Sequence, residues 1–136
     1  MEPPTSRAAT INLMYSAQLL DHFQNPRNVG DVAEADASVE IENPVCGDVI
    51  RLSLKMHNGR IYKICFKAKG CVPSMACGSA LTELAVGKTV DEARNLKRET
   101  LVKAVGGLPN ASTHAAQLAL DALSAALAKL PHSLTL

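Results

Sequence analysis

Hydrophobic and polar residues alternate along the middle of the chain, from Asp48 to Lys69, with the period of two that is typical of half-buried strands. In the first run the apolar positions are Ile50, Leu52, Leu54 and Met56, and in the second they are Tyr62, Ile64, Phe66 and Ala68. His57-Asn58-Gly59 separates the two runs and predicts a turn. The pattern therefore predicts a β-hairpin with one apolar face.

The register of this hairpin follows from the requirement that apolar residues share a face. A three-residue turn with Gly59 left-handed pairs Leu52 with Ile64, whereas a two-residue turn pairs Leu52 with Cys65 and mixes the faces. The three-residue turn also pairs Ile50 with Phe66. Followed to the open end, this register places Val45 near Cys71 and Cys46 near Gly70. We therefore expect Cys46 and Cys71 to be neighbours in space.

The flanking sequence adds one more strand and several helices. Val39 and Ile41 alternate with glutamates and predict a short strand before the hairpin. Helical periodicity and capping signals predict helices over about 15–24, 73–86, 100–105 and 113–130, and a capping box at Thr89-Val90-Asp91-Glu92 predicts that another short helix begins there. This order predicts an α+β fold, a small antiparallel three-stranded sheet with helices packed on one face. We expect a disordered lead-in over 1–11, one domain over 12–131 and a tail over 132–136.

Composition narrows the class of protein. The chain has 136 residues, of which 47% are hydrophobic, so one compact domain with a real core is expected. The net charge of +1 gives no electrostatic case for nucleic acid, and no apolar run approaches the roughly 20 residues that span a membrane. The four cysteines come without the pattern of a secretory signal, which predicts a reducing cytoplasm and favours metal or sulfur chemistry over disulfides.

Four residues are candidate metal ligands. Cys46 lies beside Gly47, and Asp48 follows as a hard oxygen donor. Cys71 lies just before a predicted helix, where the helix dipole is expected to depress the thiol pKa. His114 lies in the first turn of the last helix, which is expected to favour the neutral, ligating imidazole. Two thiolates, an imidazole and a carboxylate suit tetrahedral zinc or iron–sulfur chemistry.

Three segments closely resemble the NifU-like (IscU) scaffold family of iron–sulfur cluster assembly: His22 to Gly30, Pro44 to Asp48, and Phe66 to Cys71. The resemblance runs from about Met14 to Leu130. It implies a non-enzymatic scaffold that carries a [2Fe–2S] cluster or iron, receives sulfur from a cysteine desulfurase and passes the cluster to acceptor proteins. The family's ligands are three cysteines with an aspartate and a histidine beside them. Cys46, Asp48, Cys71 and His114 match four of these five positions, and the family's aspartate is associated with cluster lability.

The sequence departs from this family at two places. The third cysteine of the family directly follows the histidine, and this chain has Ala115 there. The family's Leu-Pro-Pro-Val-Lys segment, which binds a chaperone, reads Leu108-Pro109-Asn110-Ala111-Ser112. Cys77 is a substitute for the missing thiol only if 71–75 is a loop; otherwise its spacing from Leu81 places it in the core.

Two other functions remain open from the sequence. One is a zinc-bound sulfur acceptor, in which a cysteine desulfurase passes persulfide sulfur to Cys46 or Cys71. The other is a degenerate paralogue that binds partners and assembles nothing.

Overall fold

The structure of the chain is a computed structural model, and it describes residues 15–134. The expected lead-in over 1–11 lies outside the described residues. The helices and strands, in chain order, are α2 (Ala17–Gln24), β1 (Ala37–Glu42), β2 (Val49–His57), β3 (Arg60–Lys69), α3 (Val72–Ala85), α4 (Val90–Arg94), α5 (Arg98–Ala104) and α6 (Thr113–Ala128). Short 3-10 turns lie on either side of α6, at Asn110–Ser112 and at His132–Leu134.

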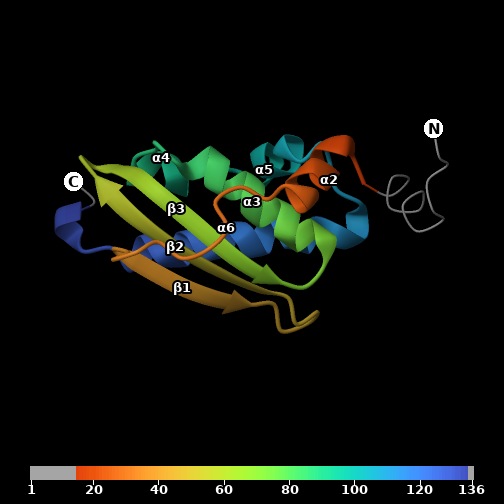
Figure 1. Cartoon of the computed structure of the whole chain (residues 1–136), viewed down its shortest axis with the longest axis horizontal. Helices are drawn as coiled ribbons and strands as arrows, with labels where there is room; N and C mark the ends of the chain where they lie inside the picture. The colour runs from red at the N-terminus through yellow and green to blue at the C-terminus, as the bar shows by residue number, and fades with distance from the viewer. Residues whose placement is uncertain (1–14, 135–136) are drawn as a thin grey trace.

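The three strands form one antiparallel sheet in the order β1-β2-β3, and helices cover one of its faces (Figure 1). Helix α6 packs against β1 and β2, and α3 packs against β3 and α6. The alternating apolar residues of the strands meet these helices in a single core, whose largest fully buried side chains include Leu19, Ile50, Leu52, Leu54, Ile64, Phe66, Leu81, Leu123 and Leu127. The predicted α+β fold is therefore confirmed.

The hairpin turn differs from the prediction. His57 pairs with Arg60, so the turn has two residues, and Asn58 (φ 52°) and Gly59 (φ 76°) both have the positive φ angles of a type I′ turn. A register shift follows at once, because Lys55 pairs with Lys63 while Met56 pairs with Ile61. Tyr62 is the extra residue of this bulge, and its side chain is 64% exposed instead of lying on the apolar face.

The shorter turn and the bulge each shift the pairing by one residue from the predicted register, so together they keep the correct faces but move the pairing by two residues. Leu52 pairs with Phe66 and Ile50 with Ala68, so the predicted pairs Leu52–Ile64 and Ile50–Phe66 are wrong although the apolar face is right. At the open end the last pair is Val49 with Lys69. The next position along β2 is then Asp48 rather than Cys46, and it is Asp48 that lies against Gly70.

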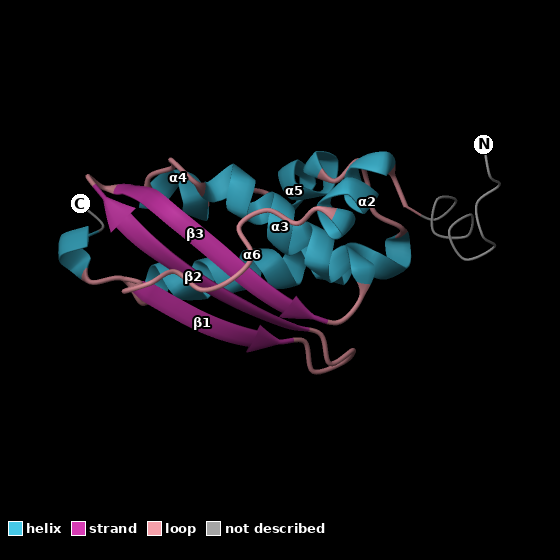
Figure 2. Cartoon of the chain, viewed as in Figure 1, coloured by secondary structure: helices cyan, strands magenta, loops and turns pink. Residues whose placement is uncertain are grey.

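The connection between α2 and β1 crosses the face of the sheet that the helices leave open (Figure 2). Val32 N–H donates to Ser53 Oγ at 2.8 Å, and Ser53 pairs with Cys65 across the strands. The crossing segment explains why Cys65, which shares its strand face with lysines, is buried. Asp31 lies 3.0 Å from Arg51 and 3.2 Å from Lys67, and it separates these two like charges.

Helix α3 begins directly after Cys71, which is its N-cap residue. Cys77 therefore lies in the second turn and is fully buried in the core, which confirms the reading of Cys77 as a core residue. Burial raises the pKa of this thiol to about 12. His22, which the alternation of the sequence does not mark as a core position, is buried as well, because α2 packs against α3 there; its Nδ1 lies 2.8 Å from Ser79 Oγ.

Among residues 15–134, no helix combines the length and the apolar character needed to cross a membrane.

Candidate metal centre

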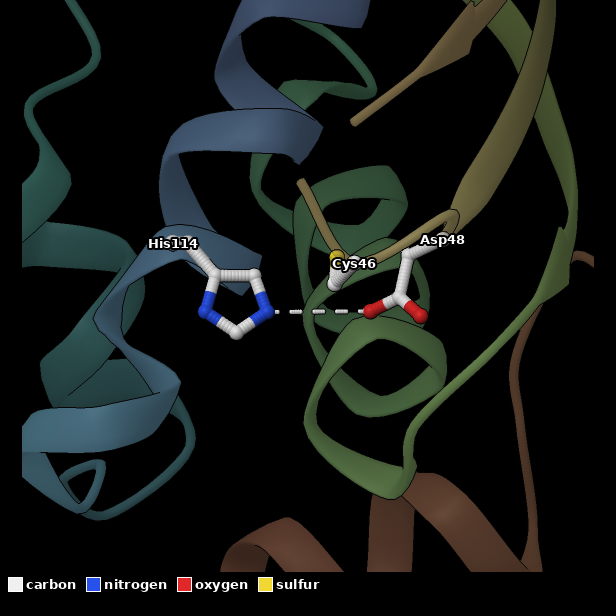
Figure 3. A group of neighbouring side chains, drawn as sticks. All are labelled: Cys46, Asp48 and His114. Atoms are coloured by element: carbon white, nitrogen blue, oxygen red, sulfur yellow. Dashed lines mark ion pairs between the residues drawn. The ribbon is translucent and has the colours of Figure 1, made fainter. Parts of the chain in front are cut away.

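Three of the four candidate ligands, Cys46, Asp48 and His114, lie close together between the loop that leads into β2 and the first turn of α6, and the fourth, Cys71, contacts Asp48. Figure 3 shows Cys46 and Asp48 on the loop that leads into β2, with the ring of His114 facing them from the first turn of α6. One ligand atom from each of these three residues lies within 4.8 Å of the other two. Cys71 joins them through Asp48, since its Sγ donates to Asp48 Oδ2 at 3.1 Å. Residues far apart in sequence are thus brought to one place.

Asp48 is the centre of this arrangement. Its side chain is buried, and Oδ2 accepts the hydroxyl hydrogen of Ser74 at 2.7 Å in addition to the Cys71 thiol. His114 Nε2 lies 3.7 Å from the same oxygen, the ion pair drawn in Figure 3. One carboxylate oxygen therefore faces a hydroxyl, a thiol and an imidazole.

Two glycines shape the backbone around Asp48. Gly70 has φ +140°, and a Cβ built on it would lie 2.1 Å from Asp48 Oδ1, so the carboxylate occupies the space that any side chain at 70 would need. Gly47 has φ +77° but has open space around its Cα. Gly47 thus allows the positive φ angle of the loop, whereas Gly70 leaves room for the Asp48 carboxylate.

The pKa values of the Asp48 carboxyl and the Cys71 thiol follow from their surroundings. Burial tends to raise the pKa of Asp48, but hydrogen bonds from Ser74, Cys71 and Cys46 outweigh it, and the pKa lies below its usual value. Burial raises the pKa of the Cys71 thiol; the Ser74 hydrogen bond lowers it in part, and the Asp48 carboxylate raises it again. The predicted depression of the Cys71 pKa by the helix dipole is therefore wrong for the metal-free site.

Helix α6 contributes fewer candidate ligands to the site than the loops beside β2 and α3. His114 Nε2 is buried, and among residues 15–134 it has no hydrogen-bond partner. Ala115, the next residue, is 1% exposed and belongs to the core. Asp121 accepts a hydrogen bond from Gln117 at 2.8 Å on the exposed side of α6 and is not part of the ligand group. His114 is thus the one residue of the ligand group that α6 supplies.

Sequence reasoning missed Ser74. It is the third residue of α3 and follows Cys71 by three positions, a spacing that puts both side chains on the same side of a helix start. The available signal was a serine three residues after a candidate ligand cysteine; its burial is known only from the structure.

Comparisons with known proteins show the family to which this chain belongs. The model of the NifU-like N-terminal domain matches residues 14–134. The chain belongs to the NifU-like N-terminal domain family. The iron–sulfur cluster assembly scaffold protein IscU 1 of Archaeoglobus fulgidus is 45% identical over 114 residues, which cover 84% of this chain and 74% of that protein.

Other relatives agree with this membership. A Drosophila melanogaster protein named iron–sulfur cluster assembly enzyme IscU is 40% identical over 119 residues, covering 85% of this chain and 77% of that protein. Among solved structures, the N-terminal part of a NifU-like protein from Brucella abortus superposes with a TM-score of 0.73 at 21% identity, covering 88% of this chain and 96% of that one. At that identity the superposition supports the fold alone.

The structure shows where the two positions at which this sequence differs from the family pattern lie in the NifU-like domain. Ala115 faces the core, and the segment Leu108–Ser112 ends in the 3-10 turn that leads into α6. Both departures lie on the α6 side of the site. Cys46, Asp48 and Cys71, by contrast, lie in the loops before β2 and between β3 and α3.

Proposed function

We propose that this NifU-like chain is a scaffold on which an iron–sulfur cluster is assembled and from which the cluster passes to acceptor proteins. The observation that carries the proposal is the convergence of Cys46, Cys71 and His114 on the buried carboxylate of Asp48. The names of the IscU relatives support the same function.

The donor set suits a [2Fe–2S] cluster with mixed ligands. Two thiolates are available for terminal positions, and an imidazole nitrogen and a carboxylate oxygen are available for the other two. The Cys71 Sγ–H donates to Asp48 Oδ2 in a hydrogen bond. Because a cysteine binds iron as the thiolate, loading with iron releases the Cys71 proton to solvent, and binding weakens as the pH falls.

The position of the site suits temporary cargo. Cys46 is exposed and Cys71 is half-buried, so a bound cluster stays at the surface of the protein. Two thiolates with one oxygen and one nitrogen donor hold iron less firmly than four thiolates, because thiolate is the preferred ligand of these clusters. The arrangement favours binding followed by release rather than permanent storage.

This function implies partners and a compartment. A cysteine desulfurase supplies sulfur, and apo iron–sulfur proteins accept the finished cluster, so the chain itself acts as a carrier and not as an enzyme. The segment Leu108–Ser112 lacks the second proline and the lysine of the family's chaperone motif, so chaperone-driven release is not part of the proposal. The four cysteines are unpaired, which suits the reducing cytoplasm.

Anaerobic reconstitution with iron and sulfide tests this function. We expect a visible charge-transfer spectrum with about two irons per cluster, and we expect its loss in Cys46→Ala and in Cys71→Ala. Cys65→Ala, which removes a buried cysteine outside the site, is the matched control and should keep the spectrum. A protein that binds stoichiometric zinc and takes up persulfide sulfur without forming a cluster would contradict the proposal and favour the zinc-bound sulfur acceptor. The IscU relatives do not favour that alternative.

A further inference from the structure

Ser74 brings a buried hydroxyl to the site, and the proposed ligand set makes no use of it. The residue is 2% exposed. Its Oγ donates to Asp48 Oδ2 at 2.7 Å and lies 3.2 Å from Cys71 Sγ. One hydroxyl therefore contacts two of the four proposed ligands at once.

The hydrogen bond from Ser74 fixes the rotation of the Asp48 carboxylate about its last side-chain torsion. The Asp48 carboxylate lies against Gly70 on its Oδ1 side, where a Cβ would approach to 2.1 Å. Rotation of a carboxylate about its last torsion is otherwise broad and has low barriers. The hydrogen bond at Oδ2 selects the orientation in which this oxygen faces Cys71 and His114.

We propose that Ser74 is a positioning residue, which holds the Asp48 carboxylate turned toward Cys71 and His114 so that arriving iron meets oxygen, sulfur and nitrogen donors already in place. The inference rests on the proposed function, since it assumes that Asp48 and Cys71 are ligands. When Cys71 gives up its proton to bind iron, the Ser74 hydroxyl remains the donor that orients Asp48. Partners of this kind, one step removed from the metal, typically change metal affinity by about 10–100-fold when they are removed.

Anaerobic titration with Co²⁺ measures the effect without any cluster chemistry. We expect Ser74→Ala to bind Co²⁺ about 10–100-fold more weakly than the unmodified protein and to change the d–d absorption bands that report ligand geometry. Ser74→Thr and Ser74→Val form an isosteric pair that differs only in the hydroxyl group. Thr should retain both the affinity and the spectrum, and Val should lose both.

A double-mutant cycle shows whether Ser74 acts through Asp48. In an Asp48→Ala background, Ser74→Ala should cost less than about twofold in Co²⁺ affinity, because the group that it positions is gone. Ser79→Ala is the matched control, since Ser79 is fully buried on the same helix but contacts His22 and Arg27. It should leave the Co²⁺ affinity and spectrum unchanged.

Three results would overturn the inference. They are unaltered Co²⁺ affinity and spectrum in Ser74→Ala, equal losses in Ser74→Thr and Ser74→Val, and an undiminished effect of Ser74→Ala in the Asp48→Ala background. In each case the proposed function stands if Cys71→Ala still abolishes Co²⁺ binding. If Cys46→Ala and Cys71→Ala both bind Co²⁺ like the unmodified protein, the proposed function itself is wrong.

Discussion

The two sides of the site are built very differently. The hairpin side consists of Cys46, Asp48 and Cys71. The Asp48 carboxylate accepts hydrogen bonds from Ser74 and Cys71 and fills the space that the missing side chain of Gly70 leaves. The α6 side supplies His114, whose buried Nε2 has no hydrogen-bond partner among residues 15–134. The geometry of the site is therefore set where β2 begins and where β3 passes into α3, and α6 completes it with one imidazole ring.

The substitution with the largest expected effect on Co²⁺ binding is Gly70→Ala, which disturbs the hairpin side of the site. The new Cβ would lie 2.1 Å from Asp48 Oδ1 and must displace the carboxylate. We expect Co²⁺ binding to be lost, because Asp48 can no longer face Cys71 and His114. Calorimetric titration with Co²⁺ and urea unfolding of the metal-free protein measure the two effects.

Gly47→Ala separates that clash from backbone strain. Gly47 also has a positive φ angle but has open space around it, so the substitution should cost about 1–2 kcal/mol of unfolding free energy from strain alone. Binding of Co²⁺ should persist in Gly47→Ala. Equal losses of binding in the two variants would show that the carboxylate does not depend on the space at Gly70.

The second substitution removes His114, the candidate ligand that α6 supplies. His114→Ala should weaken Co²⁺ binding by about tenfold, because one neutral ligand is lost while the thiols and the carboxylate keep their positions. Titration of Cys71→Ala under the same conditions should show a larger loss. His57→Ala, at the exposed turn of the hairpin, is the control and should bind normally. If His114→Ala lost more affinity than Cys71→Ala, the ranking of the two sides would be reversed.

The smallest expected effect concerns Cys77, which does not replace the thiol missing at Ala115. Cys77→Ala should leave Co²⁺ binding unchanged and should lower the free energy of unfolding by about 1 kcal/mol through lost packing. A shift in the Co²⁺ charge-transfer bands of this variant would place Cys77 among the ligands instead.

Cys77 also makes stability depend on pH. Its pKa is raised from 9.0 to about 12 in the folded protein, so its contribution is fully present below pH 9 and is lost as the pH rises toward 12. Between pH 8 and pH 10 the unmodified protein should lose about 1 kcal/mol more unfolding free energy than Cys77→Ala. Urea unfolding of both proteins at the two pH values measures the difference, and parallel losses would contradict the assignment.

The sequence predicted the fold because strand alternation and helix periodicity depend on burial alone. It did not predict the register, since the pattern of faces is the same whether the pairing moves by two residues or not. The structure combines an Asn58-Gly59 turn with a bulge at Tyr62, and their effects on the faces cancel. Only a bulge signal at Tyr62 would have distinguished the two solutions.

The assignment of Cys46, Asp48, Cys71 and His114 as ligands stays a prediction. The structure brings Cys46, Asp48 and His114 together and places Cys71 against Asp48, whereas the sequence placed Cys71 next to Cys46. The expected low pKa of Cys71 failed because burial acts more strongly than the helix N-terminus. Ser74 was missed because its role depends on a tertiary contact with Asp48, which helix periodicity does not contain.

The central claim is that two thiolates, a carboxylate and an imidazole of one chain hold the cluster. X-ray absorption at the iron edge of the reconstituted protein tests this most directly. For a [2Fe–2S] cluster the account predicts about three sulfur and one nitrogen or oxygen neighbours per iron, since two bridging sulfides and one thiolate accompany each Asp48 or His114 ligand. A shell of sulfur alone, at about four per iron, would contradict it, because Asp48 and His114 would then play no part in holding the cluster.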